Sequence, residues 1–61
     1  MNGKEIIKKL KMAGWELKAV NGSHHQMMKA GVKVTVPVHG NHDLKIKTVI
    51  TIEKQTGEKL R

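Results

Sequence analysis

Two histidines placed directly after a turn are the residues of this chain best suited to proton-transfer chemistry. His24 and His25 follow Gly22 and Ser23, and a tight turn gathers backbone N–H groups and a hydroxyl in an arrangement that favours an anion. Imidazole exchanges protons near neutral pH. A histidine held over a phosphate could therefore take the proton of a ribose 2′-OH or protonate a leaving 5′-oxygen. The competing interpretation is that both histidines are ordinary exposed side chains.

Adjacent residues of a strand point to opposite faces, so only one of His24 and His25 can face a substrate. The other two histidines, His39 and His42, lie in a predicted polar loop beside Asp43. Imidazole is a common metal ligand, but placement in a loop and the lack of cysteine argue against a metal site. We therefore expect no metal and no cofactor. His39 is either an ordinary loop residue or a phosphate or substrate contact beside His24.

Other catalytic patterns are missing from the sequence. Zero cysteines exclude disulfide scaffolds, zinc fingers and thiol nucleophiles. Ser23 has no histidine and aspartate at a recognisable relay spacing, and five acidic residues leave little material for paired carboxylates. No glycine-rich nucleotide-binding motif occurs. The chemistry that remains is that of histidine, or binding without catalysis.

The charge balance points to a polyanionic partner. Twelve Lys and Arg against five Asp and Glu give a formal net charge of +7, which nucleic acid would match most simply. Trp15 is the only aromatic residue, so stacking platforms are excluded and RNA would be held by its phosphates and groove shape. The alternatives are a solvated basic surface or an acidic protein partner. The lysines favoured as RNA-binding are Lys18, Lys29 and Lys33, because they are expected to lie close to the hairpin that carries the histidines, followed by Lys45 and Lys47.

Chain length limits the architecture. Sixty-one residues make one domain, 1–61, that buries roughly 60% of its unfolded surface, so the core must be thin. No apolar run approaches the ~20 residues of a membrane span, and no signal-peptide core occurs. We therefore expect a cytoplasmic protein without a membrane partner.

Hydrophobic periodicity predicts the elements that position these residues. Apolar residues at helical spacing over 3–13 predict an amphipathic helix, with Asn2 as its N-cap and Gly14 as its stop. Beyond it the period changes to two, which predicts strands. Asn21-Gly22 is a strong hairpin signal, because both residues tolerate positive φ. The strands are expected over 15–19, with Trp15, Leu17 and Ala19 on one face, over 24–29, and over 32–38.

The last third of the chain is open to two interpretations. Residues 47–56 suit a helix capped by Thr48 and ended by Gly57, whereas the β-branched residues of 45–52 would also suit a fourth strand. The glycine stop favours the helix, and the tail 58–61 is expected to fray. The prediction is an α+β fold of order α-β-β-β-α, a three-stranded antiparallel sheet with two helices on one face. Core positions include Trp15, Met12, Met27 and Met28.

In four segments the chain resembles the HicA toxin family of toxin–antitoxin modules, small mRNA interferases with a fold like that of double-stranded-RNA-binding domains. The resemblance runs from the first helix through Gly57. Each segment is short, and their order and spacing in a small basic chain carry the resemblance. The segments are Leu10 to Trp15, Gly22-Ser23-His24-His25, Thr35 to His39, and Ile52 to Gly57.

This resemblance implies the toxin of a type II module, a metal-independent endoribonuclease with His24 as its catalytic residue. Gly22 and Ser23 match the turn that presents His24, and His39 matches a positioning residue at most. His25 matches a position that varies, and some members carry their only histidine there.

The partners implied by the resemblance are mRNA and a HicB-type antitoxin that covers the site and neutralises its charge. We expect a monomer when free and a hetero-oligomer with the antitoxin. Val38 and Thr51 stand where relatives often carry a basic residue, which would weaken RNA contacts there. The alternative function is a non-catalytic RNA- or DNA-binding module of the same fold.

Overall fold

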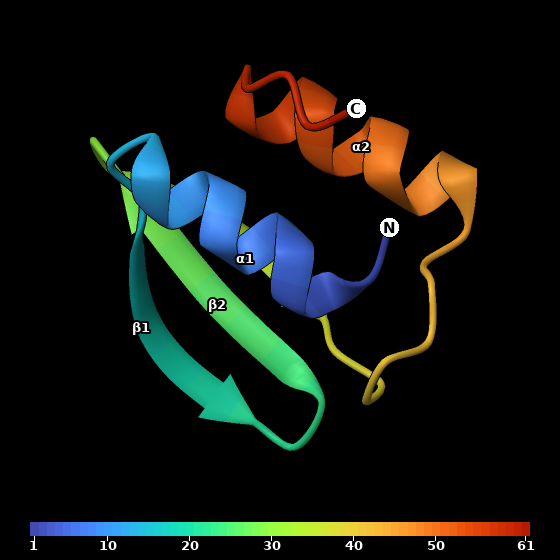
Figure 1. The fold of residues 1–61 in the computed structure, drawn as a ribbon. Helices are drawn as coiled ribbons and strands as arrows, with labels where there is room; N and C mark the ends of the chain where they lie inside the picture. The colour runs from blue at the N-terminus through green and yellow to red at the C-terminus, as the bar shows by residue number, and fades with distance from the viewer.

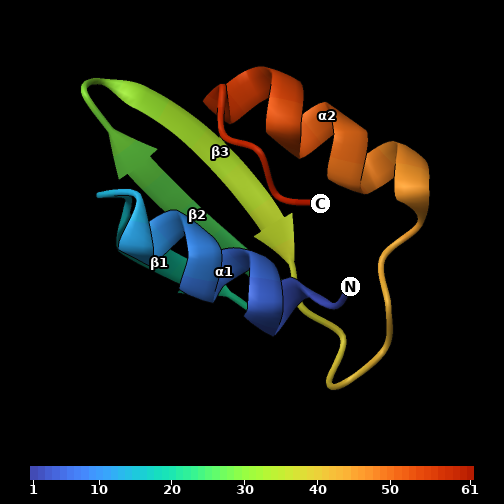
Figure 2. The same cartoon turned by 45° about the horizontal axis from the view of Figure 1, so that its top comes forward.

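The elements follow one another as helix, three strands and helix, which confirms the predicted α+β order. The computed structural model describes all 61 residues. One antiparallel sheet has the strand order β1-β2-β3, with α1 lying across it and α2 running beside β3 (Figures 1 and 2). Neither helix has the length and apolar character needed to cross a bilayer. The elements are α1 (Gly3–Met12), β1 (Glu16–Asn21), β2 (His24–Lys29), β3 (Val32–Pro37) and α2 (Ile46–Thr56).

Helix α1 begins and ends as predicted. Asn2 accepts from the Glu5 backbone N–H at 2.9 Å, and Glu5 accepts in return from the Asn2 N–H at 3.0 Å, a reciprocal cap that satisfies two free donors. Gly14, with φ of 98°, follows the last turn. The apolar stripe of α1 is buried, but Met12 is 80% exposed, so its predicted core role is wrong. Met12 lies past the stripe, on the side of the helix away from the sheet.

A β-bulge in β1 changes which residues face the helices. Leu17 pairs with Met27 and Ala19 pairs with Gln26, so Lys18 between them has no partner in β2. The extra residue shifts the alternation by one position. Leu17 therefore faces the helix side of the sheet and Ala19 the open side, which corrects the prediction that they share a face.

The core lies between the helix side of the sheet and the two helices. Trp15 is 4% exposed, as predicted, and its indole Nε1 donates to Glu58 Oε2 at 3.0 Å. The opposite side of the sheet carries no helix and faces solvent. Ten side chains form the buried cluster: Ile6, Ile7, Leu10, Trp15, Met27, Val34, Val36, Val49, Ile52 and Leu60.

Helix α2 is confirmed over a fourth strand, but its start differs from the prediction. It begins after Lys45 with no side-chain cap, so Thr48 is not the N-cap. Gly57 ends it in the left-handed region, with φ of 72°. The buried face contains Val49 and Ile52.

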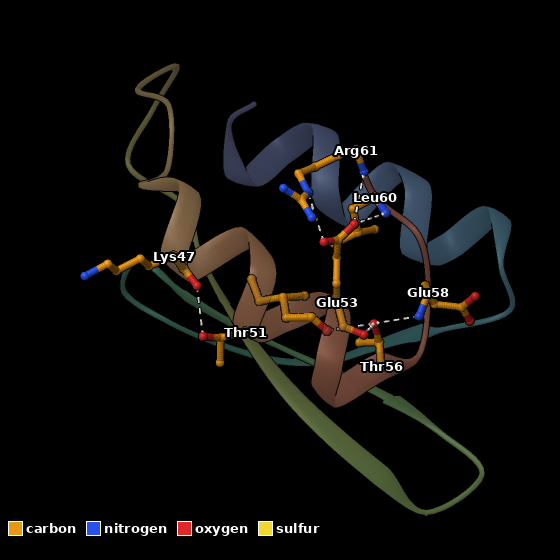
Figure 3. Close-up of polar contacts among 8 residues, drawn as sticks. Lys47, Thr51, Glu53, Thr56, Glu58, Leu60 and Arg61 are labelled. Carbon is orange, nitrogen blue, oxygen red and sulfur yellow. Dashed lines mark hydrogen bonds and ion pairs between the residues drawn. The ribbon is translucent and has the colours of Figure 1, made fainter.

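The C-terminal tail is ordered against the core, which corrects the expectation that residues 58–61 fray. Leu60 is 2% exposed and belongs to the buried cluster. Glu53 accepts hydrogen bonds from the Leu60 N–H at 2.8 Å and from the Arg61 N–H at 3.2 Å, and Arg61 Nε lies 3.0 Å from its other oxygen (Figure 3). The Leu60 side chain and the Glu53 carboxylate thus hold the end of the tail, and the bond between Trp15 and Glu58 holds its start.

Acid should weaken this attachment of the tail. The hydrogen bond from the Leu60 backbone, helped by the bond and charge of Arg61, lowers the pKa of Glu53 from its usual 4.5. Because the folded state binds this proton less readily, the stabilisation is present above that value and is lost as pH falls below it. We expect Glu53→Gln to lower the Tm at about pH 6 and to lower it much less at about pH 3. An equal difference in Tm at both pH values would contradict this role.

Candidate active site

A two-residue turn presents His24 at one end of the sheet. Asn21 pairs with His24, so Gly22 and Ser23 form the turn between β1 and β2. Gly22 has φ of 59°, whereas Asn21 keeps a negative φ, which moves the predicted turn by one residue. Nothing lies within 4 Å of a Cβ placed on Gly22, so the backbone conformation rather than space requires glycine there.

The two adjacent histidines face opposite sides of the sheet, as predicted. His24 is exposed on the open side, where its strand partners are Asn21 and Pro37. His25 is half-buried on the helix side beside Val36, with its Nδ1 3.3 Å from the Ser23 carbonyl oxygen. The imidazole of His24 is therefore the one that a ligand on the open face can reach.

The end of β3 and the start of α1 fix this turn. The Val38 N–H donates to the Ser23 carbonyl oxygen at 2.7 Å. Gly3, at the first turn of α1, packs directly against the end of β3. A Cβ on Gly3 would be 2.2 Å from the Pro37 carbonyl oxygen and 2.9 Å from Val38 Cγ2. Three segments distant in sequence thus meet at the base of the His24 turn.

Gly3→Ala should destabilise the protein although alanine favours helix. The added methyl meets the Pro37 backbone, which cannot move without shifting the end of β3, so we expect a cost of about 1–3 kcal/mol in the free energy of unfolding. Helix propensity alone would give a gain of up to about 1 kcal/mol. Urea unfolding measures the difference, with Lys4→Ala, at the next and exposed position, as the control. A stabilised Gly3→Ala protein would refute the close contact.

The second histidine cluster lies in the loop after β3. His39 is exposed two residues beyond Pro37, the strand partner of His24, and its carbonyl oxygen accepts from the His42 N–H at 3.0 Å. Its imidazole makes no hydrogen bond within the chain. No three His, Cys, Asp or Glu side chains come together in an arrangement that could hold a metal ion.

Two of the five lysines predicted to bind RNA have intramolecular partners. Lys18 lies 2.8 Å from Glu16, and its hydrogen bond and charge lower the pKa of that carboxyl. Lys29 donates to the Ala13 carbonyl oxygen at 2.6 Å and lies 3.5 Å from Glu58. Lys29 therefore helps to join the end of β2 to α1 and to the tail. Lys33, Lys45 and Lys47 are exposed and make no ion pair.

The strand register separates the lysines from His24 more than the sequence suggested. Lys29 pairs with Val32 at the opposite end of β2 from His24, five residues or about 17 Å along the strand. Lys33 pairs with Met28 near that same end. The expectation that Lys29 and Lys33 lie close to the histidine hairpin is therefore wrong.

Gly3 is the site residue that sequence reasoning missed. A glycine just after an N-cap looks like an ordinary residue of the helix start. Glycine is required at position 3 because a side chain there would collide with the carbonyl of Pro37, 34 residues later in the chain. No pattern within the sequence indicates that contact.

Comparison with known proteins supports the resemblance seen in the sequence. No curated protein matches the chain. A family model described as HicA toxin of bacterial toxin–antitoxin matches residues 3–58, from the start of α1 through the tail residue that accepts the Trp15 hydrogen bond. With nearly the whole chain matched, this protein belongs to the HicA toxin family.

Proposed function

We propose that this toxin is an mRNA interferase that cleaves RNA without a metal ion, with His24 as general acid or base. The observation that supports the proposal is the exposed His24 imidazole on a turn held by Gly22, by the Val38–Ser23 hydrogen bond and by the close approach of Gly3. A proton-transfer group must be positioned against its substrate, and this anchoring fixes the backbone that carries the His24 imidazole.

In the proposed reaction the ribose 2′-oxygen attacks the adjacent phosphorus while its proton leaves to a base. The bond from phosphorus to the 5′-oxygen breaks, and that oxygen takes up a proton. The products are a 2′,3′-cyclic phosphate and a 5′-hydroxyl. His24 carries out one of these proton transfers, and we propose that Ser23, in the same turn, and His39, two residues beyond the strand partner of His24, contact the phosphate. His25 faces the other side of the sheet and supports the turn.

The proposed partners follow from charge and family. Lysines hold the RNA backbone, with Lys33, Lys45 and Lys47 free of intramolecular ion pairs and Lys18 and Lys29 already engaged. The inhibitor is a HicB-type antitoxin that covers the His24 face and compensates the +7 charge. We propose a monomer when free and a hetero-oligomer with the antitoxin.

A 2′-deoxy substitution separates this function from its alternative. The purified toxin should cut a single-stranded RNA, and replacing the nucleotide at the cut site by its 2′-deoxy form should abolish that cut, because the nucleophile is gone. A non-catalytic RNA- or DNA-binding module would bind both oligonucleotides and cut neither. Cleavage of the 2′-deoxy substrate at the same bond would refute attack by the 2′-oxygen.

A further inference from the structure

Two residues that line a polar hollow between β3 and α2, Lys33 and Thr35, share the open side of the sheet with His24. Residues that pair directly across strands share a face. His24 lies opposite Pro37, and Thr35 and Lys33 follow on the same face at alternate positions of β3. From His24 to the row of Lys33 the distance along the strands is about 14 Å.

The hollow lies where β3 meets α2. It has a volume of about 350 Å³. Val34 and Ile52 contribute its apolar part, and both are buried. The polar side chains that line it are Lys33, Thr35, Thr48, Thr51 and Gln55.

The polar lining suits a phosphate and its ribose. It includes one ammonium group, three hydroxyls and one amide, with no carboxylate among them. Among these polar side chains only Thr51 has an intramolecular partner, its hydroxyl donating to the Lys47 carbonyl oxygen at 2.9 Å (Figure 3). Lysine, threonine and glutamine side chains are common contacts of nucleic-acid phosphates and sugars. The remaining donors are therefore available to a ligand.

We propose that this hollow is a second RNA subsite, which holds a phosphate and ribose of the strand whose scissile bond lies at His24. The inference rests on the proposed ribonuclease function. The RNA strand crosses the open side of the sheet past Gln26 and Thr35, so binding should strengthen once the RNA is long enough to reach Lys33. The absence of carboxylates and aromatic rings fits recognition of the backbone rather than of bases.

Length-dependent binding tests the subsite. The His24→Ala toxin, which should leave RNA intact, is titrated with fluorescent single-stranded RNAs of about two and about eight nucleotides, a range that brackets the strand length needed to reach the hollow. We expect tighter binding of the longer RNA. In the His24→Ala background, Lys33→Gln with Thr35→Val should weaken binding of the longer RNA about tenfold. The slope of log K against the logarithm of the salt concentration should become less negative by about 0.7. Circular dichroism checks that both altered side chains, which are exposed, leave the fold intact.

The control removes a charge from the helix side of the molecule. Lys11 on α1 is exposed and makes no ion pair, so Lys11→Gln should keep most of the gain in affinity with length. The inference is overturned if Lys11→Gln loses as much of the gain in affinity as the double variant does. It is also overturned if the double variant keeps this gain, even where the double variant binds the antitoxin less tightly. Cleavage by the wild-type toxin, measured separately, tests the proposed function, so the two can fail independently.

Discussion

Replacing His24 by alanine should lower the rate of RNA cleavage by about 10²–10⁴-fold, the usual contribution of a positioned proton-transfer group. The side chain is exposed and makes no hydrogen bond within the chain, so its removal should leave the fold and its Tm nearly unchanged. Single-turnover cleavage of an RNA oligonucleotide measures the loss. In cells, the same variant should no longer arrest growth.

His25→Gln is the matched control for this experiment. It removes an imidazole from the neighbouring position, which faces the helix side of the sheet and lies 3.3 Å from the Ser23 carbonyl oxygen. We expect a much smaller loss of cleavage than for His24→Ala. A large loss for His25→Gln with full activity of His24→Ala would assign the chemistry to His25 instead.

Leu60→Ala should cost about 2–5 kcal/mol in the free energy of unfolding, as is usual when a buried leucine is truncated. Leu60 is 2% exposed within the buried cluster, and its backbone N–H is bound by Glu53. A single core in a domain this small rarely supplies more than about 3–5 kcal/mol. The variant should therefore be largely unfolded at growth temperature, and urea unfolding at low temperature measures the cost.

Lys59→Ala provides the comparison within the same tail. Lys59 is exposed and makes no ion pair, so its truncation should move the urea midpoint very little. A midpoint for Leu60→Ala equal to that of Lys59→Ala would mean that the tail contributes nothing to the fold.

Local signals predicted most of the architecture. Asn2 caps α1 as predicted, through a contact with the backbone of Glu5 three residues later, and the Asn21-Gly22 turn signal precedes β2. Gly57 ends α2 as expected. The opposite orientation of His24 and His25 also follows from strand geometry alone. These features are local, so the sequence specifies them directly.

The features that were not predicted depend on contacts between distant segments. The bulge at Lys18 reorients Ala19 because of pairing with β2, and the tail is ordered because Glu53 and the core receive Leu60. Gly3 is required by the Pro37 carbonyl. Each arises only when the chain is folded, so composition and periodicity carry no sign of it.

The positions of the lysines at the candidate site also depend on contacts between distant segments, so the sequence did not predict them. Sequence proximity to the hairpin favoured Lys29, but the strand direction places it at the far end of β2, where it bonds to the Ala13 carbonyl oxygen. Lys33 lies near that same end, and its position beside α2 creates a polar hollow that the sequence alone did not indicate. The net charge of the chain could be predicted from the sequence, whereas the positions of the lysines relative to His24 could not.

Metal-independent cleavage by His24 is tested by cleaving RNA in the presence of EDTA and identifying the chemical ends of the products. We expect undiminished cleavage that yields 2′,3′-cyclic phosphate and 5′-hydroxyl ends. Loss of activity in EDTA that added Mg²⁺ restores, or products with 3′-hydroxyl and 5′-phosphate ends, would contradict metal-independent cleavage by His24.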